Sequence, residues 1–292
     1  MSDTKNVKLG VCQVFYKGFD LGYTKGGVEV SVTTEKHKVE IDQFGKTAIN
    51  EYVMGRDLTV TVPMAETTLE NMAAIMPGAT LIETGGTVAT GTITCATAPV
   101  AGTDTITVNG KVISFVASNP QDGECLIAPS TWSAAAQATL LADMLNASND
   151  PLIAAASYSA ATTIVTVKYG NKSIYGTTGK KSTEGNSFTL SASSAKFTVS
   201  KATLEGGTDS TAKKVSVSTG VGSDLLTLAG ELRLHPVGKA DDDLTDDFIV
   251  PLAGTAGGLS YGYKVDEERV FNVEFTGYPN PSTKELFKAG GR

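Results

Sequence analysis

The chain has 292 residues, of which 41% are hydrophobic and 7% aromatic, and its 24 Lys and Arg against 31 Asp and Glu give a formal net charge of −7. That balance argues against a protein that holds nucleic acid by neutralising phosphates, because such binding needs a basic surface. The sequence has no long apolar run, and residues 1–5 lack the apolar stretch of a secretory signal, so we expect no membrane partner and folding in a cytoplasm.

The composition also predicts the fold class. A chain of this length exceeds one average domain, which suggests two units. Its 31 glycines and its many Thr, Ser, Ala and Val residues favour strands joined by tight turns, so we predict a mainly β protein. The three cysteines, Cys12, Cys95 and Cys125, are odd in number and widely spaced, which predicts buried free thiols and neither a disulfide framework nor a metal site.

Charge is distributed unevenly along the chain. Residues 87–211 carry only 8 acids and 7 lysines, and all four arginines lie outside this segment. Glycine pairs at 85–86 and 206–207 flank it, as expected of a hinged insertion. We therefore predict a discontinuous domain of residues 1–86 and 211–292, called the host, which carries an inserted, surface-exposed domain at residues 87–210, called the insert.

The first host segment predicts two strands and a helix. Hydrophobic and polar residues alternate over 28–33 and 58–62, which is the period of half-buried strands. Residues 35–52 between them are polar at their centre, so we interpret them as an extended loop or hairpin that leaves the body and contacts a partner. Residues 67–76 then predict a short amphipathic helix, with Thr67 and Glu70 as a capping box and Pro77 at its end.

The insert reads as a small α+β module. Two strands, 105–108 and 111–116, flank Asn109 and Gly110, which predicts a hairpin with a type I′ turn. Alanine and leucine at helical spacing predict a helix that starts between Ser130 and Ser133 and ends before Pro151. Further strands are predicted at the residue ranges 164–167, 188–190 and 197–199.

The second host segment resumes the strand pattern. Hydrophobic residues separated by Pro and Gly predict strands at 215–217, 228–234, 248–250 and 271–275. Near the end of the chain, Ser282 and Glu285 form a second capping box, which predicts a short terminal helix that ends at Gly290.

Residues with catalytic potential are few and scattered. His37 and His235 each lack a second histidine, cysteine or acid at ligand spacing, and no common catalytic motif occurs. Residues 45–47 resemble the end of a phosphate-binding loop, but Glu40 stands where its first glycine should be. We therefore predict that the protein is not an enzyme and binds no cofactor.

One acidic stretch resembles a calcium loop at its start. Residues 241–247 hold five aspartates, but the sixth position of the loop is Asp246 where glycine is required, and the twelfth is Leu252 where glutamate is required. A solvated acidic turn is the preferred interpretation, so we predict no metal site.

Several host segments together resemble a known family. Residues 26–35, 39–45, 50–56 and 66–71 are similar to the major tail tube protein of long-tailed bacteriophages, and residues 270–279 are similar to the closing strand of that family. The motifs are closer to the non-contractile, siphovirus-like type. Within the insert, residues 104–110 and 202–207 are similar to a module that recurs in phage virion proteins, commonly on the outer surface.

The resemblance implies a tail-tube fold of two packed antiparallel sheets with a flanking helix. It implies hexameric rings that stack into the virion tail, assembled in the bacterial cytoplasm, through which viral double-stranded DNA passes without specific binding. Implied partners are other copies of the chain, a tape measure protein and a tail terminator. The implied contacts between subunits lie in the long loop, at Asp42, Gln43, Phe44 and Lys46. Candidates for an acidic lumen or inter-ring loop are Asp241, Asp242, Asp243, Asp246 and Asp247, for which a solvated turn far from DNA is an equal alternative.

Two other functions remain open at this point. A β-rich receptor- or carbohydrate-binding surface protein would use the insert as the binder, although the single Trp132 and sparse aromatic residues offer no sugar-stacking platform. A carboxylate-dependent hydrolase is the weakest alternative, because no constellation of residues supports it.

Overall fold

The computed structural model describes residues 10–128 and 132–290 and has a mainly β fold, as predicted. The host strands are β1 (Cys12–Tyr16), β2 (Phe19–Asp20), β3 (Glu29–Glu40), β4 (Ala48–Met64), β5 (Ala79–Thr84), β14 (Ala212–Val217), β15 (Gly230–Pro236), β16 (Phe248–Gly254), β17 (Phe271–Gly277) and β18 (Lys288–Ala289). The insert strands are β6 (Thr90–Cys95), β7 (Thr105–Val108), β8 (Lys111–Val116), β9 (Glu124–Leu126), β10 (Ala156–Ala161), β11 (Ile164–Tyr169), β12 (Leu190–Ala192) and β13 (Phe197–Val199). The helices are α1 (Leu69–Ile75), α2 (Ala134–Ala147), α3 (Pro151–Ala154) and α4 (Lys172–Tyr175).

The host is built on one eight-stranded sheet that folds over its own core. Its strand order is β2-β1-β15-β16-β17-β4-β3, with β18 paired to β16. Strands β16 and β17 pair through two residue pairs, Ala253 with Gly277 and Gly254 with Thr276, and this corner joins two half-sheets. The rings of Tyr16 on β1 and Phe275 on β17 lie 5.0 Å apart although their strands are not neighbours. The two packed sheets of the expected fold are therefore two halves of one sheet, which bury a shared apolar face.

Helix α1 flanks this core, as predicted, but its cap differs. The Thr68 side chain, and not that of Thr67, accepts a hydrogen bond from the Asn71 backbone N–H at 3.1 Å. Thr67 instead accepts a hydrogen bond from Arg269 Nε at 2.8 Å. The predicted capping box does not form: a tertiary contact engages Thr67, the N-cap moves to Thr68, and Glu70 accepts a hydrogen bond from Lys213 instead. Ile75 at the end of the helix is fully buried.

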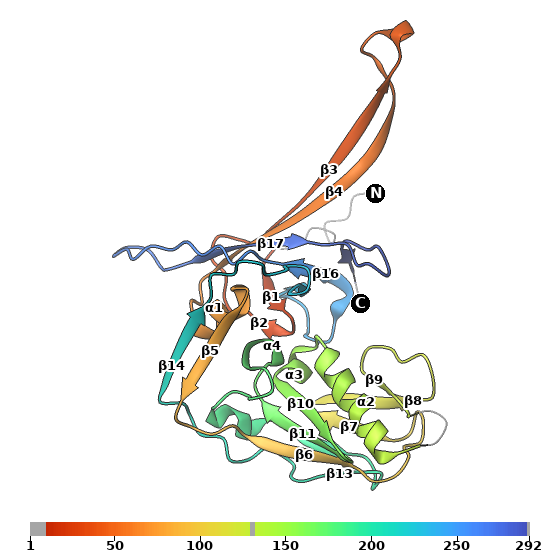
Figure 1. Cartoon of the computed structure of the whole chain (residues 1–292), viewed down its shortest axis with the longest axis vertical. Helices are drawn as coiled ribbons and strands as arrows, with labels where there is room; N and C mark the ends of the chain where they lie inside the picture. The colour runs from red at the N-terminus through yellow and green to blue at the C-terminus, as the bar shows by residue number, and fades with distance from the viewer. Residues whose placement is uncertain (1–9, 129–131, 291–292) are drawn as a thin grey trace.

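A two-stranded antiparallel ribbon, β5 with β14, connects the host to the insert (Figure 1). The insert contains two four-stranded sheets, β10-β11-β6-β13 and β12-β7-β8-β9. Asn109 and Gly110 both have positive φ, 47° and 88°, which confirms the predicted type I′ turn. Helix α2 begins after the N-cap Ser133, within the predicted interval, whereas Ser130 lies outside the described residues.

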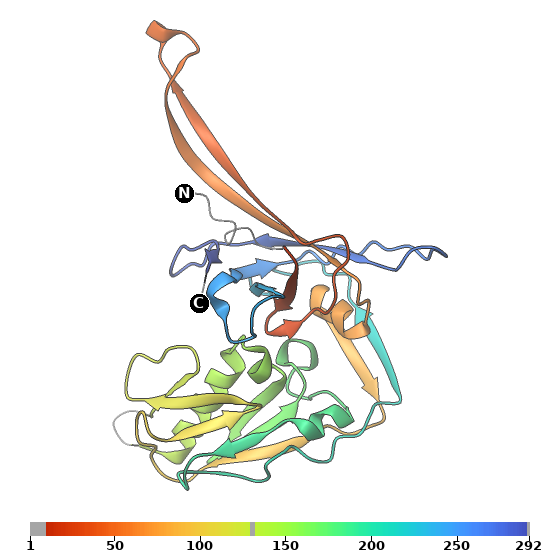
Figure 2. The same cartoon turned by 180° about the vertical axis from the view of Figure 1, so that it is seen from behind.

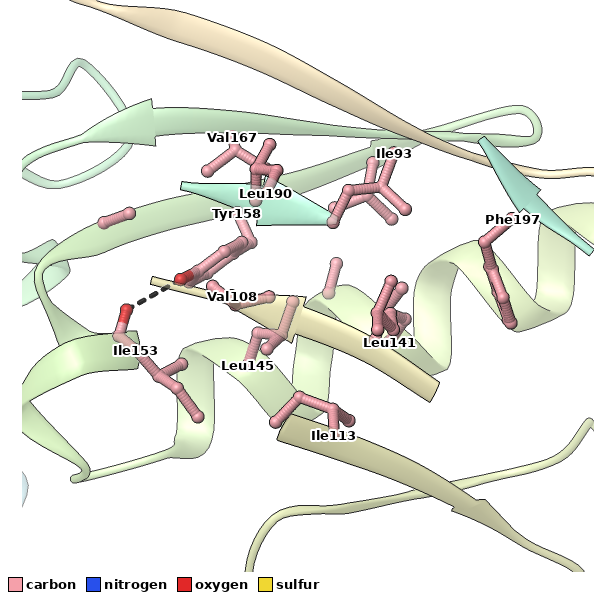
Figure 3. Close-up of a cluster of buried hydrophobic side chains, with 14 of the residues drawn as sticks. Ile93, Val108, Ile113, Leu141, Leu145, Ile153, Tyr158, Val167, Leu190 and Phe197 are labelled. Atoms are coloured by element: carbon pink, nitrogen blue, oxygen red, sulfur yellow. Dashed lines mark hydrogen bonds between the residues drawn. The ribbon is translucent and has the colours of Figure 1, made fainter. Parts of the chain in front are cut away.

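The insert has a hydrophobic core of its own (Figure 3). Side chains from both sheets and from α2 meet there, including Leu141 and Leu145, and Tyr158 donates a hydrogen bond from its hydroxyl to the Ile153 carbonyl at 2.7 Å. The host core draws on residues before 76 and after 231, and the two cores have no residue in common. The predicted domain boundaries fall at the end of the ribbon that is nearer the insert, and the division into two domains stays a prediction.

The predicted C-terminal helix is wrong. The side-chain oxygen of Asn280 accepts hydrogen bonds from the backbone N–H groups of Ser282 and Thr283, and Lys284 has a left-handed φ of 59°. This turn places Lys288 beside Ile249 of β16, so the end of the chain forms the short strand β18. The capping box does not form because other side chains satisfy its two backbone donors: Asn280 accepts from the Ser282 N–H, and the Thr283 hydroxyl accepts from the Glu285 N–H.

Candidate functional site

A long β-hairpin, β3 with β4, projects from the host at the end of the molecule opposite the insert (Figures 1 and 2). Its register runs from Glu29 opposite Thr61 to Glu40 opposite Ala48. The register shifts at two places, so Met54 and Ile49 of β4 have no paired residue on β3. The sequence left loop and hairpin as alternatives for this segment, and the structure shows the hairpin. Its alternating β-branched and polar residues suit a ladder that is exposed on both faces.

The four residues expected at a subunit contact all lie at or beside the tip of this hairpin. Residues Asp42–Phe44 form a 3₁₀ turn, and Gly45 has a φ of 63°, which reverses the chain. Asp42, Gln43, Phe44 and Lys46 are all exposed, and Phe44 leaves 64% of its surface in solvent. The tip therefore presents an aromatic ring together with charges of both signs.

Apolar side chains also remain exposed along the hairpin. Ile49, Tyr52, Val53 and Met54 each leave half or more of their surface in solvent. A two-stranded ribbon with both faces open is marginally stable at best in water, because nothing covers its side chains. Exposed apolar residues concentrated in this way are typical of interaction surfaces.

The middle of the hairpin, called the shaft, pairs residues 33–38 of β3 with residues 51–57 of β4. Its inner face continues the buried face of β4, which includes Leu58, and its outer face continues the exposed face of the host sheet. The inner face carries three bases and one acid, which are Lys36, Lys38, Arg56 and Glu51. The outer face carries Glu35 and Asp57, with His37 further out.

The exposed face of the host sheet next to the hairpin is acidic and rich in hydroxyl groups. One cross-strand row contains Glu274, Thr61 and Glu29, and the next contains Thr276, Thr59 and Ser31. These rows include two carboxylates and no lysine or arginine. The arrangement forms a polar surface with a negative charge.

The predicted acidic run forms a compact local structure elsewhere, between β15 and β16. Lys239 Nζ lies 2.9 Å from an Asp243 carboxylate oxygen and 3.3 Å from one of Asp246. Hydrogen bonds from Thr245 and from Lys239 hold the pKa of Asp243 below its usual range. Asp241 and Asp242 are exposed and line a cavity of about 360 Å³ between the host sheet and the insert. Their assignment to a lumen or an inter-ring contact stays a prediction.

The last member of the run, Asp247, belongs to a buried cluster that the sequence analysis missed. His235 Nδ1 lies 2.7 Å from Asp247 Oδ1, and Arg233 Nη1 lies 3.5 Å from Asp247 Oδ2. All three residues are at least 95% buried, and the guanidinium of Arg233 lies 4.4 Å from the centre of the Phe15 ring. The twelve-residue separation of His235 and Asp247 gives no spacing signal, because the β15–β16 turn brings them together.

No protein-family model matches the chain, and no curated protein matches it. The proposed function therefore rests on the arrangement of the chain's own residues.

Within residues 10–128 and 132–290, no group of three or more His, Cys, Asp or Glu side chains could hold a metal ion. No helix of the same residues has the length and hydrophobicity needed to span a membrane. Burial raises the pKa of the Cys95 thiol to about 11 and that of Cys125 to about 12, so both remain protonated at neutral pH.

Proposed function

We propose that the chain is a structural virion protein that forms stacked hexameric rings of a phage tail tube, the conduit for genome delivery into a bacterial host. The observation that carries the proposal is the projecting hairpin, whose tip and shaft expose Phe44, Tyr52, Val53 and Met54. Its place in the chain coincides with the segments that resemble the tail tube family. The proposal assigns no catalytic role and no cofactor.

A hairpin that leaves its own body supports assembly from identical copies. Contacts between two different surfaces of identical chains close into rings in one direction and stack without limit in the other. Strand β3 is an edge of the host sheet, so it has unpaired backbone groups that association with a neighbour would cover. Assembly would also bury the apolar side chains that a single chain leaves in water.

The acidic, hydroxyl-rich sheet face supports the role of a channel wall. A duplex carries about one negative charge per 1.7 Å of its axis, and a basic wall would hold it through released counterions. Rows that contain Glu274 and Glu29 with threonine and serine would repel phosphates weakly and let the duplex slide. We propose that these two rows over the host body, and not the projecting shaft, line the lumen, with a tape measure protein and a tail terminator as further partners.

The position of the insert supports a place on the outside of the tube. It lies at the opposite end of the molecule from the hairpin (Figure 2). A closed core and few charges allow it to stand beside the tube without taking part in ring contacts. This arrangement would leave the insert available for decoration of the tail or for contact with the host cell.

Negative-stain electron microscopy of the purified chain at rising concentration tests the proposal. We expect rings and hollow tubes of constant width with knobs outside. The variant with Val53→Asp and Met54→Asp should remain monomeric in sedimentation velocity, because charge at these positions opposes burial. Val112→Asp is the matched control, since Val112 lies on the insert and is 55% exposed, close to the 57% of Val53. This control should assemble as the parent does.

Chains that remain monomers at every concentration would contradict the tube proposal. That result would favour a receptor- or carbohydrate-binding protein in which the insert is the binder.

A further inference from the structure

The two faces of the hairpin shaft carry opposite net charge, and four of the charged side chains form no ion pair within the described part of one chain. Lys36 has a partner in Glu51 of the same face, with Nζ and a carboxylate oxygen 3.5 Å apart. Among the residues that the structure describes, Lys38 and Arg56 on the inner face form no ion pair, and neither do Glu35 and Asp57 on the outer face. Two bases without an ion pair therefore lie on one face of the ribbon, and two acids without an ion pair lie on the opposite face.

We propose that the inner face of one hairpin shaft packs against the outer face of the shaft of the next copy of this chain. Lys38 and Arg56 of one copy would then lie against Glu35 and Asp57 of its neighbour. The inference rests on the proposed tube function and adds to it the surfaces that neighbouring copies use. Another copy of the chain therefore packs on each face of the shaft.

Ring symmetry supports contact between two unlike faces. A rotational ring repeats one heterologous contact, in which a surface of each copy meets a different surface of the next. A shaft that is positive on one face and negative on the other satisfies this condition with a single element. Like faces would bring lysine to arginine or glutamate to aspartate, which is unfavourable.

Apolar residues on the same two faces supply area for the contact. Val53 lies opposite Lys36 on the inner face, and Tyr52 lies opposite His37 on the outer face. Both are more than half exposed in the single chain. The charges then set orientation and partner choice, whereas the apolar side chains contribute burial.

Complementary charge reversal tests the contact. The inner variant carries Lys38→Glu and Arg56→Glu, and the outer variant carries Glu35→Lys and Asp57→Lys. Each should need at least about tenfold more protein than the parent to assemble, because every interface then joins like charges. An equimolar mixture should recover the parental concentration, since copies that alternate around an even-numbered ring make every interface complementary again.

A control variant with Lys172→Glu and Lys201→Glu reverses two exposed charges on the insert and should assemble normally. Circular dichroism of all variants should match the parent, because the substituted side chains of the shaft are all exposed. Assembly of the inner and outer variants at the parental concentration, or failure of the mixture to recover, would overturn the shaft contact and leave the tube proposal standing. Failure of the parent itself to assemble would overturn both.

Discussion

The hairpin and the insert both contain β-strands, but the insert buries its apolar side chains and the hairpin exposes them. The insert buries Phe115, Phe188 and Phe197 between its two sheets and α2. The hairpin leaves Val53 and Met54 in solvent. Strand content therefore does not show whether a segment needs a partner. The burial or exposure of its apolar side chains is the better guide.

Low charge in the insert and high charge in the hairpin follow from the same difference. A ribbon with two open faces uses charge to stay in water as a monomer and to select its partner once copies meet.

The largest expected effect comes from truncating a buried side chain of the insert. Truncation of an exposed side chain of the hairpin is the comparison. Phe115→Ala removes a buried ring that stacks on Phe197 with ring centres 4.6 Å apart, and it should lower the free energy of unfolding of the insert by about 3–5 kcal/mol. Met54→Ala should change the free energy of unfolding by less than about 0.5 kcal/mol, because the side chain is exposed. Urea titration followed by circular dichroism measures both variants, and fluorescence of Trp132, the single tryptophan, reports on the insert.

Equal losses of stability from these two substitutions would contradict the contrast between a closed insert and an open hairpin.

A smaller effect is expected where the insert meets the host. Gly18 has a φ of 71°, and a Cβ atom there would lie 2.4 Å from the Cβ of Ala154 in α3. Gly18→Ala should destabilise the host–insert contact by about 1–3 kcal/mol, since α3 must move away. The matched control is Gly102→Ala, because Gly102 has a φ of 70° but no heavy atom within 4 Å of the added methyl group. Hydrogen exchange of α3 should rise only in the first variant.

Similar exchange in both glycine variants would mean that backbone strain, and not the close approach to Ala154, causes the effect.

The smallest effect concerns the pH dependence of stability at the β5–β14 ribbon, which connects the host to the insert. Burial raises the pKa of Glu70, but the hydrogen bond from Lys213, at 2.5 Å, outweighs it, so the pKa lies below the usual 4.5. A lowered folded-state pKa adds stability above pH 4.5, and this is lost as the pH falls through the folded-state value. Because both side chains are partly exposed, we expect at most about 1 kcal/mol.

Urea unfolding of the parent and of Lys213→Met at pH 6 and at pH 4 measures this contribution. The parent should lose more stability on acidification than the variant does. A loss of the same size in both chains would show that Glu70 and Lys213 are not coupled.

The sequence by itself determined the features that depend on neighbouring residues. The mainly β class, the type I′ turn at Asn109 and Gly110, and the start of α2 after Ser133 follow from local conformational preference and side-chain capping. Strand alternation in β3 and β4 likewise follows from a period of two residues. These rules act over a few residues, so one sequence is enough to apply them.

Tertiary structure alone decided which distant groups meet. The burial of His235 against Asp247, the use of Thr67 by Arg269 in place of a cap, and the turn at Asn280 in place of a helix each depend on contacts between separate segments. The opposite charges of the shaft likewise depend on a register with bulges that fixes which β4 residue faces which β3 residue. Register and packing are set by the sum of many cross-strand contacts, and no local pattern contains that sum.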